Sequence, residues 1–316
     1  MIKAKHKEMT KNKIRKKRMI VEDLQLYSLC VIPVVMLVLF RYVPMAGIIM
    51  AFKNYRYDKG IFGSEWVGLQ NFKVFLSGGE FPRLVRNTLG INFMCIVVGI
   101  MAAMALAILM FNVVGKYKVK TYQTIFILPH FISWVMVAYV VYTLLAPNEG
   151  IFNNILKTIG REPVDWYAKP ELWPAILVIC NTWKVVGMNS IYYYSSLIGI
   201  DSTLFEAADV DGATSWQKIR YVMIPSMVPI VTILFIMSIG GIFGGDFGLF
   251  YQVPKNIGAL YETTDVITTY NFRVMKVMHN MGLGTAISLF QSLIGITLVL
   301  ITNALSKKVD SSLGLF

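Results

Sequence analysis

A stripe of polar side chains runs along residues 172–198, a segment that is otherwise strongly apolar. In a helix, residues three or four apart share a face, so five of these side chains would line up and a tryptophan would lie beside them. Their amide, ammonium and hydroxyl groups would offer hydrogen bonds, and their rings a stacking face. The pattern predicts one wall of a polar pathway. Its candidate residues are Asn181, Trp183, Lys184, Met188, Tyr192 and Ser195.

Lys184 is the most informative member of this stripe, because it stands near the middle of a segment long enough to cross a bilayer. A lysine at that depth costs roughly 2.5–3.5 kcal/mol on insertion scales, so it needs a partner or water. One interpretation is that it lines a hydrated pathway. The alternative is that it pairs with an acidic residue of a second subunit and holds the two together. The sequence leaves both open.

The sequence contains no arrangement of residues that is typical of covalent catalysis. No Walker A pattern for a nucleotide phosphate occurs, and no paired acids, metal ligands or nucleophile–base pair stand at suitable spacing. Cys30, Cys95 and Cys180 all lie in apolar runs, which favours buried thiols over a metal site or a disulfide framework. We therefore expect a protein that is not an enzyme and that holds no cofactor of its own.

The composition indicates which elements position the stripe. Of 316 residues, 56% are hydrophobic and 15% are charged, whereas about a quarter is charged in soluble domains. Such a chain cannot bury its apolar surface in one soluble core, so we predict an all-α, polytopic membrane protein. A transmembrane helix needs about 20 apolar residues. Six segments meet this length: 27–51, 88–111, 122–146, 172–198, 226–248 and 285–305.

The net charge of +12 is concentrated near the N-terminus, where residues 1–26 hold nine Lys and Arg. Lys and Arg are also denser in the tails and in the loops that share their side than in the other loops, which predicts that both termini are cytoplasmic. The tail is then a topology signal beside an anionic leaflet and not a nucleic-acid-binding arm. We divide the chain into this tail and a transmembrane domain, 27–316. Residues 68–76 predict a short helix, either in the outer interface or packed on the protein.

The loop after the fourth segment, residues 201–225, carries the signals of ordered helices. Thr203 and Glu206 have the spacing of a capping box, and Thr214 with Gln217 repeats it. Gly212 suits the left-handed position after a helix, and Pro225 would end or bend the second helix. The loop is therefore predicted to be two short helices joined at a glycine elbow.

This loop resembles the signature of the permeases of binding-protein-dependent ABC importers, the MetI-like superfamily. The resemblance rests on Glu206-Ala207-Ala208, then Gly212, then Val222-Met223-Ile224-Pro225. It departs from the usual spacing at Asp211-Gly212-Ala213 and from the usual Ile-x-Leu-Pro ending. It implies the type I ABC importer permease fold, with residues 203–214 docking in a cleft of the ATPase. The implied coupling residues are Thr203, Glu206, Ala207, Ala208, Asp211, Gly212 and Ala213.

Other segments resemble the branch that imports oligosaccharides released from polysaccharides. They run from Phe40 to Gly47 and on through Ala51 to Tyr55, from Leu128 to Trp134 and from Asp265 to Tyr270. The segment from Gly68 to Phe72 resembles carbohydrate permeases in general. Residues 244–249 depart from the pattern expected there. The resemblance implies a sugar pathway lined by the stripe. Its implied partners are a second related permease, an ATPase dimer that binds ATP and Mg, and an extracellular or periplasmic sugar-binding protein, all at the cell membrane.

The sequence leaves several alternatives open. A permease of the same fold could carry an amino acid, a peptide or phosphate, and a six-span ion channel or secondary transporter would need no ATPase. Gly240, Gly241, Gly244 and Gly245 indicate either close helix packing or an unwound stretch. Asp246 would meet either a cation of the protein or the sugar.

Overall fold

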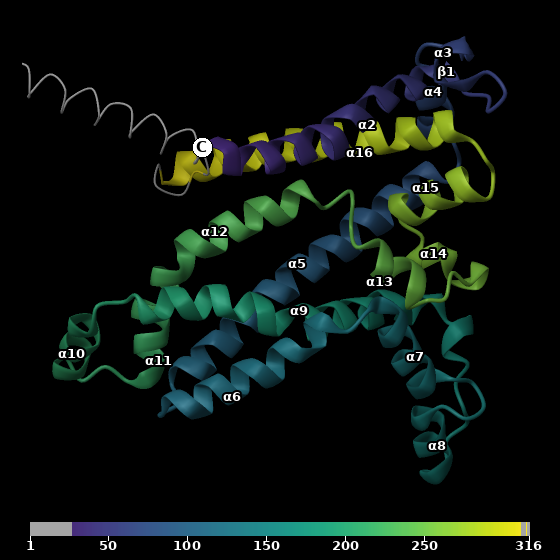
Figure 1. The fold of residues 1–316 in the computed structure, drawn as a ribbon. Helices are drawn as coiled ribbons and strands as arrows, with labels where there is room; N and C mark the ends of the chain where they lie inside the picture. The colour runs from purple at the N-terminus through teal and green to yellow at the C-terminus, as the bar shows by residue number, and fades with distance from the viewer. Residues whose placement is uncertain (1–26, 311–313, 315–316) are drawn as a thin grey trace, which may run out of the picture.

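The computed structural model describes residues 27–310 and 314, and these are largely helical (Figure 1). Four helices in this part are long and apolar enough to cross a membrane: Tyr27–Phe52, Phe81–Phe111, Ser215–Gly240 and Met281–Lys308. A bent pair, Lys116–Phe131 with Trp134–Leu145, counts as a fifth span. The helix α9 (Trp173–Ile198) is 26 residues long but less apolar than these, because it carries the polar stripe. Six helical segments therefore stand where six spans were predicted.

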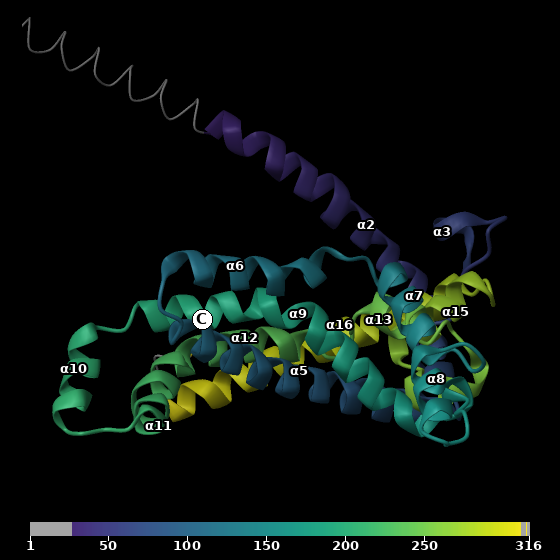
Figure 2. The same cartoon turned by 90° about the horizontal axis from the view of Figure 1, so that it is seen from below.

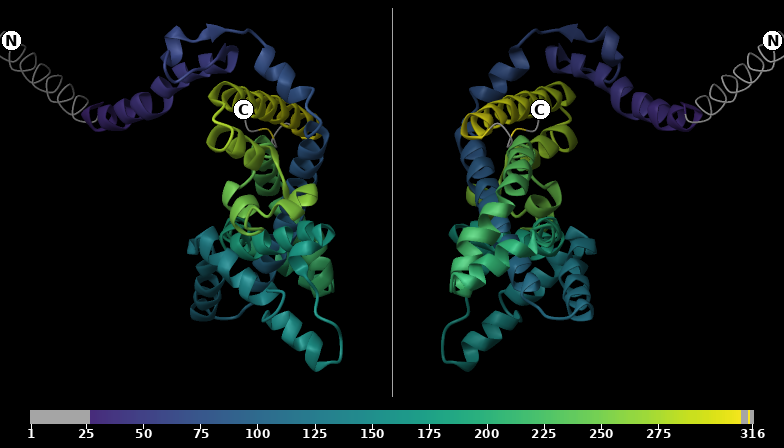
Figure 3. Two further views of the ribbon diagram at one scale, coloured as in Figure 1. Left: turned by 90° about the vertical axis from the view of Figure 1, so that its right-hand side faces the viewer. Right: turned by 90° about the vertical axis from the view of Figure 1, so that its left-hand side faces the viewer.

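Over most of its length, the first segment has few neighbours among the described residues. It is a 26-residue helix whose most apolar stretch is 0% buried, and it contains a π-turn, η1 (Val38–Tyr42), then α2 (Val43–Met45) and the 3-10 helix η2 (Ala46–Phe52). Only its last turns, in η2, pack along α16 (Met281–Val309). Figures 2 and 3 show the rest projecting away from the other helices.

The remaining long helices form the bundle. Helix α5 (Phe81–Phe111) packs along α9, α6 (Lys116–Ile127) lies beside α9, and α12 (Ile224–Gly240) packs against α16 and α9. Gly187 on α9 permits a close approach, because a Cβ atom there would lie 1.9 Å from the carbonyl oxygen of Phe126. The two helices therefore meet backbone to backbone near the end of α6.

Two ends of the bundle are clearly different (Figure 1). At one end lie α10 (Ser202–Val210) and α11 (Ser215–Lys218). The first described residues of the first span and the C-terminal end of α16 lie at the same end, which we call the α10 end. At the opposite end, the α15 end, lie the short elements: the helices α3 (Gly60–Gly63), α4 (Gln70–Leu76), α7 (Trp134–Leu145), α8 (Ile151–Thr158), α13 (Phe247–Gln252), α14 (Tyr261–Thr264) and α15 (Ile267–Lys276), the 3-10 turns η4 (Trp166–Ala168), η5 (Pro170–Leu172) and η7 (Gly258–Leu260), and the strands β1 (Lys53–Asn54) and β2 (Glu65–Trp66). The strands pair antiparallel, with Lys53 opposite Trp66.

The predicted short helix at 68–76 forms as α4, and the structure supports its packing on the protein. Phe75 is 3% exposed and belongs to a core cluster with residues of α5, α15 and α16. Phe72 contacts Phe52 at 5.5 Å between ring centroids. The helix thus joins the end of the first span to the bundle.

A buried ion cluster holds α15 in place. The Asp265 side chain is fully buried, 2.5 Å from Nη2 of Arg273 and 3.6 Å from Nη2 of Arg83, and it accepts a hydrogen bond from Thr269. The Asp265–Tyr270 segment, identified above only by resemblance, is therefore structural here, since a buried carboxylate needs such partners.

The structure differs from three predicted details, and for Pro225 it excludes one of the two predicted effects. The third span is not continuous over 122–146, because α6 passes into the 3-10 turn η3 (Leu128–Phe131) and the chain bends by 94° before α7. The fifth helix ends at Gly240 and not at 248, and Gly241–Gly244 form turns. Pro225 does not end the preceding helix, since the π-turn η6 (Ile219–Met223) joins α11 to α12 in one long helix.

The glycines of the fifth span fulfil both of the predicted roles at different positions. A Cβ on Gly240 would lie 2.4 Å from Cγ2 of Val299, which indicates close packing on α16. Gly241, Gly244 and Gly245 lie in the unwound stretch before α13.

Candidate substrate pathway and coupling site

Lys184 is buried at the bend of the third span. It is 9% exposed, and its Nζ atom donates to the carbonyl oxygens of His130 at 2.9 Å, of Pro129 at 3.4 Å and of Ile132. These carbonyls lie where α6 and η3 end, and the helix dipole makes this end negative. The Pro129 carbonyl also accepts the Ile132 N–H at 3.2 Å, whereas those of His130 and Ile132 are among the groups that a helix end leaves without helical partners. The ammonium group has three hydrogens and three acceptors, which offsets the cost of its burial.

This environment is neither of the two expected for Lys184. Within residues 27–310 no carboxylate pairs with it, and its donors are occupied by the backbone, so none is free for a ligand in this conformation. The lysine instead fastens α9 to the broken span.

The bend is linked onward to α13 through Trp134, the first residue of α7. Nζ of Lys184 lies 5.2 Å from the Trp134 ring centroid, and Nε1 of Trp134 donates to Oδ2 of Asp246 at 2.6 Å. Oδ1 of Asp246 accepts from the backbone N–H groups of Gly248 and Leu249, so Asp246 is the N-cap of α13. Its partners among the described residues are an indole and a helix end, and not the protein cation that was one of the two expectations.

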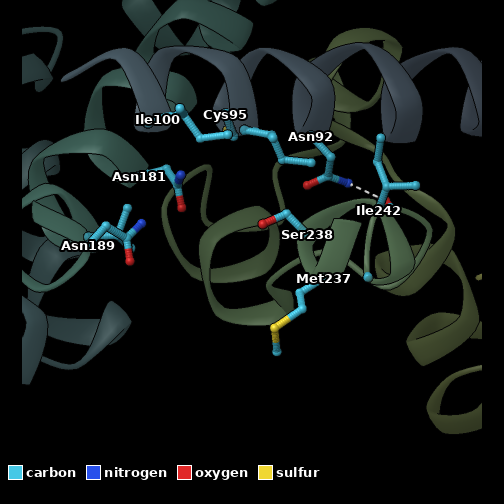
Figure 4. A pocket seen from close by; sticks show the side chains of 12 residues that line it. Asn92, Cys95, Ile100, Asn181, Asn189, Met237, Ser238 and Ile242 are labelled. Carbon is cyan, nitrogen blue, oxygen red and sulfur yellow. Dashed lines mark hydrogen bonds between the residues drawn. The ribbon is translucent and has the colours of Figure 1, made fainter. Parts of the chain in front are cut away.

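A polar cavity of about 240 Å³ lies between α5, α9 and α12 (Figure 4). Its polar lining consists of Asn92, Asn181, Asn189 and Ser238, and no charged side chain lines it. Asn92 donates to the carbonyl of Ile242 at 2.9 Å, and Ser238 donates to that of Leu234 at 2.8 Å. No hydrogen bond among the described residues engages the Asn181 and Asn189 side-chain amides. The cavity can therefore donate to and accept from neutral hydroxyl groups.

Of the six predicted pathway residues, Asn181 alone lines this cavity. Trp183 and Tyr192 are 44% and 43% exposed, Ser195 is also exposed, and Met188 is half-buried. The structure thus separates Asn181 from the other five. Whether any of the six meets a substrate stays a prediction.

Sequence reasoning missed Asn92, Asn189 and Ser238. Two stripes start at Asn181: one continues through Lys184 and Met188, the other through Val185 and Asn189. At 100° per residue, Lys184 and Asn189 point about 140° apart, so only one stripe can face the cavity. Asn189 was a detectable signal, because it repeats the amide of Asn181 two turns later.

The coupling loop is a rigid elbow at the α10 end. Asp201, and not Thr203, is the N-cap of α10, because the Asp201 carboxylate accepts from the Thr203 N–H at 3.0 Å and the helix begins at Ser202. The predicted box of Thr203 with Glu206 is therefore wrong. The Thr203 N–H bond also holds the pKa of Asp201 below its ordinary value.

Gly212 ends α10 as predicted. Its φ is +71°, its N–H donates to Asp209 O at 3.1 Å, and the Ala213 N–H donates to Ala208 O at 2.9 Å, which is the Schellman pattern. The capping box of Thr214 and Gln217 is confirmed. An ion pair between Asp209 and Lys218 joins the two arms of the elbow.

Helix α10 is attached to the bundle on one side only. Phe205 lies against Phe111 with 5.7 Å between ring centroids, and it belongs to a core cluster with residues of α5, α9 and α12. On the free side, Leu204 is 52% exposed, and Val210 beyond it is 89% exposed. Most predicted coupling residues are exposed there: Thr203, Glu206, Ala207, Asp211 and Gly212, with Ala208 and Ala213 half-buried.

A family model described as the binding-protein-dependent transport system inner membrane component matches residues 91–313. The chain belongs to this family. The match spans α10, its elbow, the bend at Lys184 and every residue that lines the polar cavity. These features therefore belong to the part of the permease that defines the family.

Individual relatives extend the match over nearly the whole permease. This chain is 29% identical over 300 residues to the polygalacturonan/rhamnogalacturonan transport system permease protein YteP of Bacillus subtilis, and the alignment covers 94% of this chain and 92% of the relative. It also matches a chain in the crystal structure of a bacterial ABC transporter that imports the acidic polysaccharide alginate, with a TM-score of 0.83, 32% identity and coverage of 94% and 99%. A second such structure, a complex with an alginate pentasaccharide-bound periplasmic protein, gives a TM-score of 0.82 at 32% identity, with coverage of 92% and 97%.

Proposed function

We propose that this permease forms half of the translocation pathway of an ATP-driven ABC importer for an oligosaccharide or a sugar released from a polysaccharide. A second, related permease forms the other half, and a separate ATPase dimer supplies energy from ATP and Mg. A binding protein outside delivers the sugar. The solved relatives support the delivery step, because one of them was crystallised with a sugar-bound periplasmic protein.

The observation that carries the proposal is the elbow at the α10 end. A helix that transmits force between subunits must be stiff and must leave one face free. Helix α10 meets both conditions, since its two termini are capped, the Asp209–Lys218 pair braces it, and its outer face is uncovered. We infer that this face docks on the ATPase, with Glu206 exposed for contact with basic groups there.

Two further features support the proposed assembly. Most of the first span has no packing partner among residues 27–310, which fits a helix that lies against a second permease or lipid. The polar cavity offers amides and a hydroxyl but no charge, a lining suited to the hydroxyl groups of a sugar in transit.

The orientation follows from the same assignment. The described start of the first span and the end of α16 lie at the α10 end (Figure 1). If α10 docks on a cytoplasmic ATPase, both of those helix ends face the cytoplasm, in agreement with the charge distribution.

The test is reconstitution of the permease with its partner permease, ATPase and binding protein in liposomes. We expect the four components to copurify, and saccharide uptake to require ATP. Glu206→Lys should reduce ATPase association or uptake, whereas Glu149→Lys, an exposed acid on a loop at the opposite end, should not. Assembly without an ATPase, or uptake driven by an ion gradient alone, would exclude the proposal in favour of a channel or secondary transporter.

A further inference from the structure

A second cavity, of about 320 Å³, opens at the α15 end between α7 and the segment that begins with α13. We call it the outer cavity. It lies at the opposite end of the bundle from α10, so under the proposed orientation it faces the side from which substrate arrives. Its lining residues are Val135, Ala138, Tyr139, Tyr251, Gln252, Lys255 and Asn256.

Lys255 gives this cavity a positive charge with nothing to neutralise it. No acidic residue lines the cavity, and no ion pair within residues 27–310 includes Lys255. Its Nζ atom lies 3.6 Å from the centroid of the Tyr142 ring, a contact that fixes the ammonium group beside α7 without cancelling its charge. The lining is therefore complementary to an anion.

The backbone at this lysine is held in an uncommon conformation. Lys255 and Asn256 both have positive φ, 55° and 50°, although neither is glycine. Such conformations persist where neighbouring contacts enforce them. Here the Tyr261 hydroxyl donates to Oδ1 of Asn256 at 2.9 Å, and the Lys255 N–H donates to Gln252 O at 3.0 Å. The turn thus presents the ammonium group beside the Asn256 amide, whose N–H groups have no partner among the described residues.

The aromatic lining distinguishes a sugar from a simple anion. Tyr139 is 64% exposed, lines the cavity and has no ring partner among the described residues, so its ring is open to a stacking partner. Tyr251 is fixed by Phe247, stacked at 4.9 Å, and by Phe272 at 5.1 Å. A sugar ring can lie on such a face while its hydroxyl groups bond to Gln252 and Asn256, and an inorganic anion would use neither.

We propose that the outer cavity is a binding site for a uronate residue of an acidic oligosaccharide, with Lys255 bonding to its carboxylate and Tyr139 stacking on its ring. The inference rests on the proposed function and names the class of its substrate. The two cavities then have different roles. The charged outer cavity selects the carboxylate, and the uncharged cavity between α5, α9 and α12 lets the hydroxyl-rich saccharide pass.

The test compares an oligogalacturonate with the same oligomer after reduction of its carboxyl groups, in liposomes that hold the complete transporter. We expect the wild-type transporter to import the acidic oligomer faster. Lys255→Met should lower that uptake by about tenfold, the loss expected for one charge-assisted hydrogen bond, and should abolish the preference over the reduced oligomer. Lys255→Arg should retain the preference, and Lys169→Met, at an exposed lysine on another loop, should change neither.

A direct measurement of occupancy accompanies the uptake assay. In a complex whose native cysteines are replaced by serine, Gln252→Cys should be protected from a thiol reagent by the acidic oligomer, but not by the reduced oligomer or by inorganic phosphate. Protection by phosphate alone would overturn the proposal in favour of a simple anion site. Disassembly of the complex in Lys255→Met would overturn it in favour of a contact with the partner permease.

Equal uptake of both oligomers would also overturn the inference while leaving the proposed function intact. If instead no saccharide is imported and no ATPase copurifies, the proposed function fails, and this inference fails with it. The two failures are therefore distinguishable.

Discussion

Trp134 donates its indole N–H to the carboxylate of Asp246 over 2.6 Å, although the two residues lie 112 positions apart. The bond joins the start of α7 to the start of α13. Because the Trp134 ring also lies 5.2 Å from the ammonium group of Lys184, the contact connects three elements: α9, the bend of the third span and the loop after the fifth. If one of these elements shifts, either the others move with it or one of these two contacts breaks.

We predict that Asp246→Ala lowers the thermal unfolding midpoint of the assembled transporter. The change removes the N-cap of α13, a loss of about 1 kcal/mol, and also the acceptor of Trp134. Asp246→Asn is the control, since its side-chain oxygen can still cap the helix. An unchanged midpoint in Asp246→Ala would show that this connection does not stabilise the protein.

Lys184→Met should destabilise the bend of the third span. It leaves the carbonyls of His130 and Ile132 without their donor, while Pro129 keeps the Ile132 N–H, and an unsatisfied buried polar group costs about 1–3 kcal/mol. Limited proteolysis and thermal unfolding of the purified complex measure this, and Lys184→Arg should lie between the mutant and the wild type. If Lys184→Met is as stable as the wild type but imports no sugar, the lysine acts in the pathway and not in the bend.

Gly212→Val should weaken coupling to the ATPase. A β-branched residue in the left-handed conformation costs roughly 1–2 kcal/mol, while a Cβ there would meet nothing within 4 Å, so the effect is one of backbone strain alone. Gly212→Asn, which tolerates that conformation, is the matched control. We expect substrate-stimulated ATP hydrolysis to fall in the first variant and to persist in the second. Equal hydrolysis in both would contradict a requirement for a rigid elbow.

Cysteine substitution separates the two stripes of α9. In a transporter without native cysteines, Asn181→Cys and Asn189→Cys should react with a small thiol reagent, and the transported sugar should protect them. Tyr192→Cys, at a residue of the predicted stripe that does not line the cavity, should be insensitive to the sugar. The opposite pattern would assign the pathway to the stripe predicted from the sequence.

The orientation can be tested at the C-terminus. A reporter fused after Phe316 should be active only in its cytoplasmic form, because α16 ends at the α10 end of the bundle and we place α10 at the ATPase. A reporter active outside the cell would exclude both the orientation and the docking role of α10.

The features that the sequence predicted correctly are set by neighbouring residues or by composition. The apolar runs determined six helical segments, because burial from water depends on the residues within each run. Gly212 and the Thr214–Gln217 box were predictable for the same reason, since a cap involves residues a few positions apart. The box of Thr203 failed because Asp201, two residues earlier, supplies a better acceptor for the start of the same helix.

Only the tertiary structure decided what the polar residues within the spans do. From the sequence, Lys184 could pair with water, a substrate or an acid. In the structure it bonds to carbonyl groups more than 50 positions away, which are left free where the third span bends by 94°. Asn181 begins two stripes of one helix, and only the positions of α5 and α12 determine which stripe faces the cavity. The residue type alone determines which groups a side chain offers, but its partner depends on how helices that are distant in the sequence pack together.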